Sequence, residues 1–456
     1  MKKAVSNWGN YPTINADEVS FSMSSQLDKL LSSGSPVSVR GLGRCYGDAA
    51  LSGHVISTLK YDKIIHFDLE TGIFECQPGI SLAQILEIIV PKGWFLPVSP
   101  GTKYVTVGGA VASDVHGKNH HAEGSFSAHI IEMDVLTPAR GKVVCSALIN
   151  SDLFDATCGG MGLTGLISRV RFRLKKIQTA YISQVSVKAR NLNEILDLFE
   201  EYRSYTYSMA WIDCLKGGDA FGRSIMMAGE HALPAEVRNI PVSQLLIKPK
   251  KTTLDMPFFL PSFVLNPLSI KAFNFLYYNK QQKKEARSII PYEPFFYPLD
   301  AISNWNRMYG KKGFVQYQFV LPLDKGRQGL TDVLAQIRKK GMGSFLAVLK
   351  LFGKQESLIA FPMEGYTLAL DFPIKPGLFE FLDELDKIVL DYGGRLYLTK
   401  DARMKADIFW KSYPRAAEFL QIVNQYNPEH TFQSVQSERL LINNSAEARE
   451  LINLYQ

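Results

Sequence analysis

The chain has 456 residues, of which 46% are hydrophobic and 21% charged, and its formal net charge is +7. These values are typical of globular proteins and exclude a disordered, collagen-like or coiled-coil chain. The length allows two or three domains, and five cysteines without a C-x-x-C pair exclude a disulfide framework and favour a reducing compartment.

The first 175 residues contain short apolar segments separated by glycine-rich loops, a pattern typical of strands. One helix interrupts them, because Ser81 is a suitable N-cap for the apolar residues that recur at helical spacing behind it. Pro91 and Gly93 end this helix. We predict strands at residues 37–40, 55–59, 73–77, 130–137 and 166–174.

From about residue 180 the pattern changes to alternating strands and helices. We predict helices at residues 191–202, 331–340 and 377–392. We predict strands at residues 314–321, 345–352, 366–372 and 395–398. Residues 234–298 contain several prolines and no clear period, so we interpret them as a long irregular insertion.

Two features concern membranes. Lys2 and Lys3 are followed by no apolar segment, so we expect no secretion signal and a cytoplasmic location. Residues 256–278 are apolar and aromatic, but three prolines and Lys271 interrupt them. The prolines and the lysine prevent this segment from forming a helix that spans a bilayer.

Most of the net charge lies in one region. Residues 248–287 contain seven lysines and one arginine against two acidic residues, a net charge of +6. Basic clusters around an aromatic stretch suit a peripheral contact with a membrane surface, and they suit a solvated surface loop equally well. No recognition motif accompanies them, so we expect no nucleic-acid partner.

Two glycine segments resemble dinucleotide fingerprints but lack the required context. A Rossmann site needs a strand, a loop and then a helix whose N-terminus faces the phosphates. Residues 160–165 lead into a strand, and residues 41–47 lie between two strands. Such loops form tight turns, or they hold a diphosphate through backbone amides, with Arg40 and Arg44 adding charge.

A third glycine segment spans residues 100–121. Its small residues at 108–113 allow close approach of a flat ligand, and polar side chains follow at His116, Lys118, Asn119 and His120. The spacing of the two histidines is compatible with a metal. Because Gly117 interrupts a helix there and no third ligand is evident, we expect no metal site.

In this order, the motifs RGLGRCYGD (40–48), PGT (100–102), VGGAVA (107–112), DVHGKNHH (114–121) and GGMGLTG (159–165) resemble the FAD-linked oxidases of the vanillyl-alcohol-oxidase superfamily. The blocks HGKNHH (116–121), QYQFV (316–320), SFLAVLKLFG (344–353) and LYLTKD (396–401) are similar to its decaprenylphosphoryl-ribose 2-oxidase branch. The resemblance covers nearly the whole chain.

The resemblance implies an α+β protein with two domains. Residues 1–178 and 395–456 would form the FAD-binding (PCMH-type) domain, and residues 179–394 a substrate domain with an antiparallel sheet. Covalent members often carry a histidine where this chain has Arg44, so we predict non-covalent FAD, which acid precipitation should release. The implied cofactor-binding residues are Arg40, Gly41, Gly43, Arg44, Cys45, Tyr46, Gly47, Gly101, Thr102, Thr106, Gly108, Gly109, Ser113, His116, Gly117, Asn119, Gly162, Gly165 and Tyr397.

The resemblance also implies the reacting residues. Lys400 matches the active-site lysine of the family, and Tyr46 and His116 are the candidate proton-handling partners. Two departures from the mycobacterial enzymes alter the pocket, since Ala369 replaces a cysteine and Thr367 an asparagine. The implied substrate contacts are Trp211, Tyr309, Gln316, Gln318, Lys350 and Lys400.

The implied activity is oxidation of a secondary hydroxyl of a polyprenyl-phosphate-linked pentose to a keto sugar. A reductase of the short-chain-dehydrogenase type would complete the epimerisation, which serves cell-wall biogenesis. The alternatives are a soluble alditol or aldonolactone oxidase that uses oxygen, and a flavin-bearing sensor without turnover. The oxidase alternative typically carries an H-x-G-K motif near its C-terminus, and this chain has none.

Overall fold

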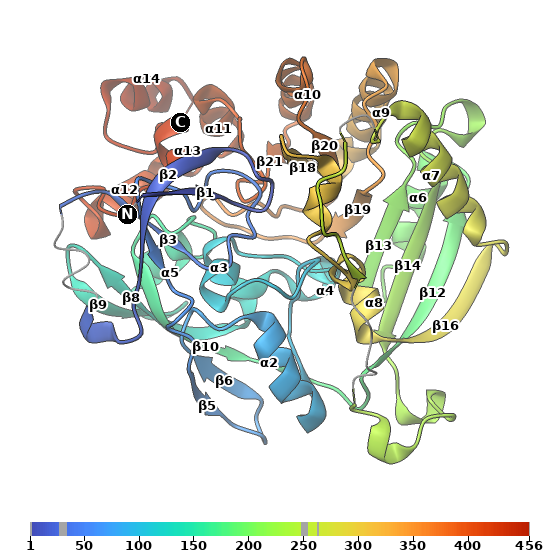
Figure 1. Cartoon of the computed structure of the whole chain (residues 1–456), viewed down its shortest axis with the longest axis horizontal. Coiled ribbons are helices and arrows are strands. Elements are labelled where there is room, and N and C mark those ends of the chain that lie inside the picture. The colour runs from blue at the N-terminus through green and yellow to red at the C-terminus, as the bar shows by residue number, and fades with distance from the viewer. Residues whose placement is uncertain (1, 27–33, 248–253, 262–263, 456) are drawn as a thin grey trace.

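The N-terminal part of the chain forms two sheets (Figure 1). The structure is a computed structural model that describes residues 2–26, 34–247, 254–261 and 264–455. The four-stranded sheet has the order β1-β2-β4-β3, in which β2 and β3 run parallel to β4. Its strands are β1 (Lys3–Ser6), β2 (Thr13–Ser20), β3 (Val37–Arg40) and β4 (His54–Ser57).

The second sheet is antiparallel, with the order β5-β6-β10-β8-β9. Its strands are β5 (Ile64–Phe67), β6 (Ile73–Cys76), β8 (Ile130–Thr137), β9 (Gly141–Cys145) and β10 (Leu166–Arg173). A two-stranded ribbon of β7 (Trp94–Phe95) and β11 (Lys175–Lys176) lies beside it. The helices of this part are α2 (Leu82–Ile89), α3 (Val107–Ala112), α4 (His120–Glu123) and α5 (Ser151–Thr157).

Helix α2 illustrates how local sequence determines this part of the fold. Ser81 and Gln84 form a reciprocal capping box, which satisfies amides that the first turn leaves free. The apolar face of the helix is buried in the same core as the five-stranded sheet. The predicted helix is therefore confirmed, with its start at the predicted cap.

The middle of the chain forms an eight-stranded antiparallel sheet with the order β16-β12-β14-β13-β19-β20-β18-β21. Its strands are β12 (Tyr181–Ala189), β13 (Tyr207–Ile212), β14 (Ser224–His231), β16 (Glu285–Pro291), β18 (Phe314–Pro322), β19 (Ala347–Phe352), β20 (Gly365–Pro373) and β21 (Arg395–Leu396). Helices α6 (Leu192–Glu201), α9 (Leu323–Lys340) and α10 (Leu378–Asp391) belong to this part.

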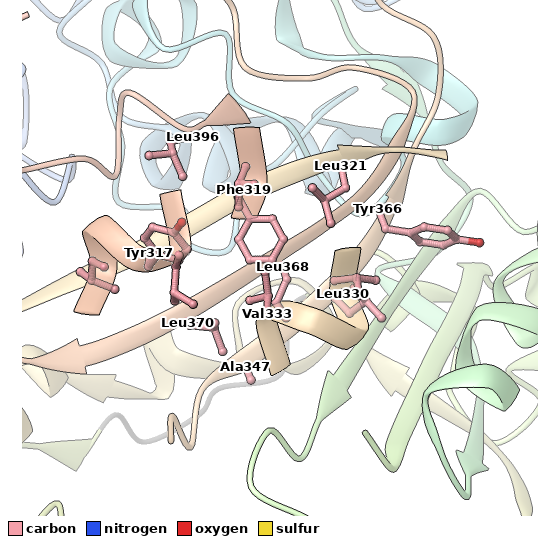
Figure 2. Packing of buried hydrophobic residues seen from close by; sticks show 14 of the residues in the cluster. Tyr317, Phe319, Leu321, Leu330, Val333, Ala347, Tyr366, Leu368, Leu370 and Leu396 are labelled. Atoms are coloured by element: carbon pink, nitrogen blue, oxygen red, sulfur yellow. The ribbon is translucent and has the colours of Figure 1, made fainter. Parts of the chain in front are cut away.

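One face of this sheet packs against helices α9 and α10. Figure 2 shows alternate residues of β18 and β20, such as Phe319 and Leu368, meeting Val333 of α9. These side chains are fully buried, and burying each such side chain stabilises the fold by about 1.5–3 kcal/mol. Because side chains alternate along a strand, the other residues of β18–β20 face the opposite way, toward the N-terminal part.

The chain then returns to its beginning. After β21, helices α11 (Ala406–Ser412), α12 (Ala416–Tyr426), α13 (Val435–Arg439) and α14 (Ala446–Tyr455) lie beside the N-terminal strands (Figure 1). Phe432 forms an isolated bridge to Val37 of β3. The Arg439 guanidinium donates to both carboxylate oxygens of Asp48, at 2.8 and 2.9 Å, and to Asp401 at 2.7 Å.

The predicted α+β class is confirmed, and most of the predicted elements form. Helix α9 begins at Leu323, eight residues before the predicted start, because buried Gly326 and Gly329 obscure its helical pattern. Residues 107–112 of the third glycine segment form a short helix, which the small residues there concealed. The predicted division at residues 178 and 394 stays a prediction.

The prediction of an irregular insertion at residues 234–298 is wrong in part. Strand β16 pairs with β12 along seven residues, and α7 (Pro267–Lys280) is a helix of 14 residues. Pro267 occupies the first helical turn, where a missing amide costs nothing, so it starts the helix that we took it to interrupt. Neither element shows a clear hydrophobic period, since β16 is a mostly exposed edge strand and α7 has large apolar side chains on its solvent side.

Two findings concern the membrane features. In the described part of the chain, no helix combines the length and hydropathy needed to cross a bilayer. Lys248, Lys250 and Lys251 of the predicted basic segment lie outside the described residues.

Arg439→Ala should destabilise the fold strongly, because it leaves buried Asp48 without its ion-pair partner and removes one of the two cations that act on buried Asp401. Loss of one partner of a buried ion pair costs about 3–5 kcal/mol. Arg415→Ala is the control, since it removes the exposed pair Arg415–Glu418, worth at most about 1 kcal/mol. Urea unfolding followed by circular dichroism measures both, and equal losses would contradict the bracing role of Arg439.

Candidate active site

A cavity of about 290 Å³ opens where the N-terminal loops face the eight-stranded sheet. All three glycine segments reach it. Most of the site residues predicted from the sequence line this cavity: Gly41, Gly43, Arg44, Cys45, Tyr46, Gly101, Thr102, Thr106, Gly108, Gly109, Ser113, His116, Gly162, Gly165, Gln316, Gln318, Lys350, Tyr397 and Lys400.

The loop after β3 offers backbone donors. In the described part of the chain, no protein group accepts from the amides of Leu42, Gly43 and Arg44. Gly43 has a φ of +61°, a conformation that glycine adopts without strain. Consecutive free amides around such a residue form a concavity that binds anions.

Arg44 places a cation beside these amides. Its guanidinium lies 3.9 Å from the centre of the Trp8 ring and 5.4 Å from that of Tyr104. Burial lowers the pKa of Arg44, and the nearby Asp300 opposes that shift. Asp300 in turn accepts from the Thr102 hydroxyl at 2.7 Å, so it connects the third glycine segment to the turn at Pro298–Ala301.

Arg40 acts from behind this loop and not from the cavity. Its guanidinium donates to the Asn7 side chain at 3.2 Å and to the Ser6 carbonyl at 3.0 Å. The same side chain occupies the space beside Gly43, where a Cβ would overlap it. Arg40 therefore shapes the loop.

Three other nominated cofactor residues also lie behind the lining. A Cβ on Gly47 would overlap the Asp401 carbonyl, so this glycine allows the C-terminal segment to approach. Gly117 has a similar role beside Ser99. Asn119 donates to the Pro97 carbonyl at 2.7 Å and holds the turn before α4.

The strands of the large sheet provide the opposite wall. On β18 the odd-numbered residues are in the core, so Gln316 and Gln318 face the cavity, and the same alternation places Lys350 of β19 there. Thr367 and Ala369 of β20 line the cavity by the same rule. The two departures from the family pattern thus lie at the cavity surface.

Hydrogen bonds around Gln318 determine the tautomer of His116. The Thr367 hydroxyl donates to the Phe319 carbonyl at 2.8 Å, so toward Gln318 it can only accept. The Gln318 amide nitrogen therefore faces Thr367 and also His116 Nε2, at 3.1 Å. Nε2 accepts, and the proton lies on Nδ1, which has no partner among the described residues. Burial lowers the pKa of His116 well below its usual value, so the ring is neutral.

Lys400 lies in the turn after β21. Its ammonium is 3.9 Å from the centre of the Tyr46 ring. Burial lowers the pKa of Lys400 to about 7, Asp371 opposes this shift and Lys350 adds to it. Burial raises the pKa of the Tyr46 phenol well above its usual value, so Tyr46 keeps its proton.

Asp371 is a site residue that sequence reasoning missed. Its carboxylate accepts from Gln316 at 2.6 Å and from the Tyr309 hydroxyl at 3.1 Å. Burial raises its pKa to about 6. An acidic residue inside the apolar run of β20 was the available indication, since such residues are rarely buried without partners.

Two nominated substrate residues lie one layer behind the wall. The Trp211 indole donates to the Phe345 carbonyl at 3.1 Å, and its ring centre is 4.7 Å from that of Tyr277 on α7. Tyr309 stacks on Phe314 at 4.1 Å between ring centres and holds Asp371. Both support the site through other residues.

The donor set fits FAD. Free amides and Arg44 suit a diphosphate, and small residues of α3 such as Gly109 and Ala112 suit a flat ring system. His120 accepts from the Gly353 amide and bonds Gln355, so both its ring nitrogens are occupied. Among the described residues, no group of three or more His, Cys, Asp or Glu side chains is placed to hold a metal ion.

Comparison with known proteins identifies the class. An FAD-binding domain family matches residues 25–146. With the cavity described above, this makes the chain an FAD-dependent oxidoreductase.

The relatives narrow the class to one family. The decaprenylphosphoryl-β-D-ribose oxidase of Mycolicibacterium smegmatis is 38% identical over 420 residues, which cover 89% of each chain. An uncharacterised protein of Streptomyces coelicolor is 31% identical over 79% of this chain and its own full length. L-gulonolactone oxidase 5 of Arabidopsis thaliana is 21% identical over 85% of this chain and 72% of its own. The chain belongs to the family of FAD-linked oxidases that contains the Mycolicibacterium enzyme.

Gly109→Leu should abolish flavin binding without unfolding the protein. Gly109 has helical backbone and is exposed on the cavity wall, so a leucine there enters the space for the cofactor. A Cβ at Gly109 meets one atom within 4 Å, the side-chain oxygen of Thr106 at 3.1 Å. Gly53→Leu is the control, because a Cβ there meets no atom within 4 Å and the residue lies away from the cavity lining. Flavin absorbance per protein and the melting temperature of the apoprotein measure the effect. Full flavin content in Gly109→Leu would contradict this placement.

Proposed function

We propose that the chain oxidises a secondary hydroxyl of a polyprenyl-phosphate-linked pentose to a ketone. This step is the first half of an epimerisation in cell-envelope glycan synthesis, and a short-chain-dehydrogenase-type reductase completes it. The observation that carries the proposal is that strands β18 and β19 present Gln316, Gln318 and Lys350 to the cavity that the flavin-binding loops line. The Mycolicibacterium relative, whose name gives decaprenylphosphoryl-β-D-ribose as its substrate, supports the substrate class.

The residues around the cavity divide the reaction between them. FAD held by Arg44 and the free amides of residues 42–44 would supply the acceptor for the hydride of the carbinol carbon. Amide groups of Gln316 and Gln318, which line the cavity, suit the recognition of sugar hydroxyls. Asp371 holds Gln316 in place.

Lys400 is the best candidate to accept the hydroxyl proton. Tyr46 keeps its proton, and the acceptor nitrogen of His116 is already occupied by the Gln318 amide. With a pKa of about 7, the amine of Lys400 is partly neutral at physiological pH. Once protonated, its ammonium offsets the negative charge that hydride transfer leaves in the cavity.

Lys400→Met should retain FAD but slow its reduction by about 10²-fold or more. In the wild type the rate should rise with pH through about 7, as the amine loses its proton, and the variant should lose this dependence. Stopped-flow bleaching of the flavin by a polyprenyl-phosphate pentose under anaerobic conditions measures both. Lys411→Met, on an exposed part of α11, is the control. A wild-type rate in Lys400→Met would remove this residue from the reaction, and turnover of free sugars with oxygen would favour the alditol-oxidase alternative.

We also propose that the surface around α7 contacts the cytoplasmic face of an anionic membrane. The exposed fractions of Leu268, Leu276 and Phe258 are 77%, 69% and 60%. Residues 248–287 carry a net charge of +6, which complements anionic lipids. Leu265, just before α7, packs in the same cluster as Trp305, which lines the cavity. A lipid-linked substrate would then enter from the bilayer side.

A double variant, Leu268→Glu with Leu276→Glu, should weaken membrane binding at least ~10-fold, because burial of each leucine is worth about 1.5–3 kcal/mol. Sedimentation with phosphatidylglycerol vesicles measures the affinity, and phosphatidylcholine vesicles should bind the wild type weakly. Leu454→Glu is the control, since that leucine is 67% exposed on α14, at the other end of the molecule in Figure 1. Unchanged binding of the double variant would contradict the assignment of this surface.

A further inference from the structure

The cavity is lined by more cations than the diphosphate of FAD accounts for. Arg44, Lys118, Lys350 and Lys400 all line it. A buried ammonium group is costly unless an opposite charge or hydrogen bonds compensate it. We therefore expect each of these four cations to have an anionic or hydrogen-bonding partner, either in the protein or in a ligand.

Two of the four cations have an identified partner. Arg44 lies beside the free amides of residues 42–44, which suit the diphosphate of FAD, and Asp300 also acts on it. Asp371 acts on Lys400. Among the described residues, no carboxylate raises the pKa of Lys118 or Lys350. These two lysines are left without a counter-charge.

The charge of Lys350 acts on Lys118, although the two residues come from distant parts of the chain. Lys118 lies between His116 and His120 and is 7% exposed, and Lys350 lies on β19. Burial and the charge of Lys350 lower the pKa of Lys118 to about 7. The Lys118 ammonium donates once, to the Phe296 carbonyl at 3.2 Å, which leaves two of its protons available.

The surroundings of this pair are apolar on one side. Met209, Phe296 and Val348 line the same cavity as the two lysines. An anion bound here would therefore continue into an apolar chain more favourably than into water. A phosphodiester has two unesterified oxygens, so it can accept from both ammonium groups at once.

We infer that Lys118 and Lys350 form the subsite for the phosphodiester of the lipid-linked substrate, with the first part of the lipid along Met209, Phe296 and Val348. The inference rests on the proposed function, and it says where in the cavity the phosphodiester of the proposed substrate binds. It adds Lys118 to the substrate-binding residues. It also separates the phosphate from Lys400, which is left to the reacting hydroxyl.

The test uses the FAD-loaded enzyme and three probes that carry no sugar. Farnesyl methyl phosphate is a diester with the charge of the substrate, farnesol lacks the phosphate, and inorganic phosphate lacks the lipid. Perturbation of the flavin spectrum or titration calorimetry gives each affinity. The variants are Lys118→Met and Lys350→Met, with Lys411→Met as the control, and flavin content with the melting temperature confirms that each is folded.

Each lysine variant should bind farnesyl methyl phosphate about 30-fold or more weakly, while its affinity for farnesol stays within about threefold. Lys118→Arg and Lys350→Arg should recover part of the loss, because the charge is kept. Equal losses for the diester and farnesol would indicate a packing role and overturn the inference. It would equally be overturned if inorganic phosphate bound as tightly as the lipid diester, because the pair would then be a general anion site.

The outcome can be separated from that of the proposed function. If the diester binds through the two lysines but no polyprenyl-phosphate pentose reduces the flavin, the subsite stands and the proposed reaction fails. If the substrate reduces the flavin of both methionine variants with unchanged KM, the reaction stands and the subsite fails.

Discussion

The segment at residues 395–402 holds the two halves of the molecule in one arrangement. Strand β21 completes the eight-stranded sheet, and the Tyr397 amide donates to the Gln318 carbonyl at 2.9 Å. Two residues later, the Thr399 carbonyl accepts from the Tyr46 amide at 3.0 Å. Arg439 then fixes Asp401 against Asp48. The main chain, tied on both sides of Lys400, therefore places its ammonium at the cavity.

The strand period has a second consequence beyond forming the core. One set of alternate residues on β18–β20 packs on α9 and α10, and the other set, including Gln316 and Asp371, faces or supports the cavity. A rigid, packed sheet thus carries the polar groups on its other face. Such support holds side chains in place more firmly than a loop would.

Local sequence patterns were sufficient to predict part of the fold and part of the candidate site. The glycine segments, the Ser81 cap and the alternating strands were predictable because spacing and residue type within a few positions determine them. The role of Asp371 was not, because its partner Tyr309 is 62 residues away and only the fold brings them together. Trp211 and Arg40 have suitable chemistry for a ligand, but the direction of a side chain follows from tertiary packing. Strand β16 and helix α7 lack a period because one face of each is exposed and partly apolar.

The route of the chain also has a consequence for biosynthesis. The cavity wall combines loops made early in translation with Tyr397, Thr399 and Lys400, and the Arg439 side chain that pairs with Asp48 and Asp401 is made later still. A ribosome that has delivered only the first 390 residues has therefore not yet produced a complete pocket. The nascent protein would remain without its cofactor until these C-terminal residues are in place, so flavin binding would be among the last events of maturation.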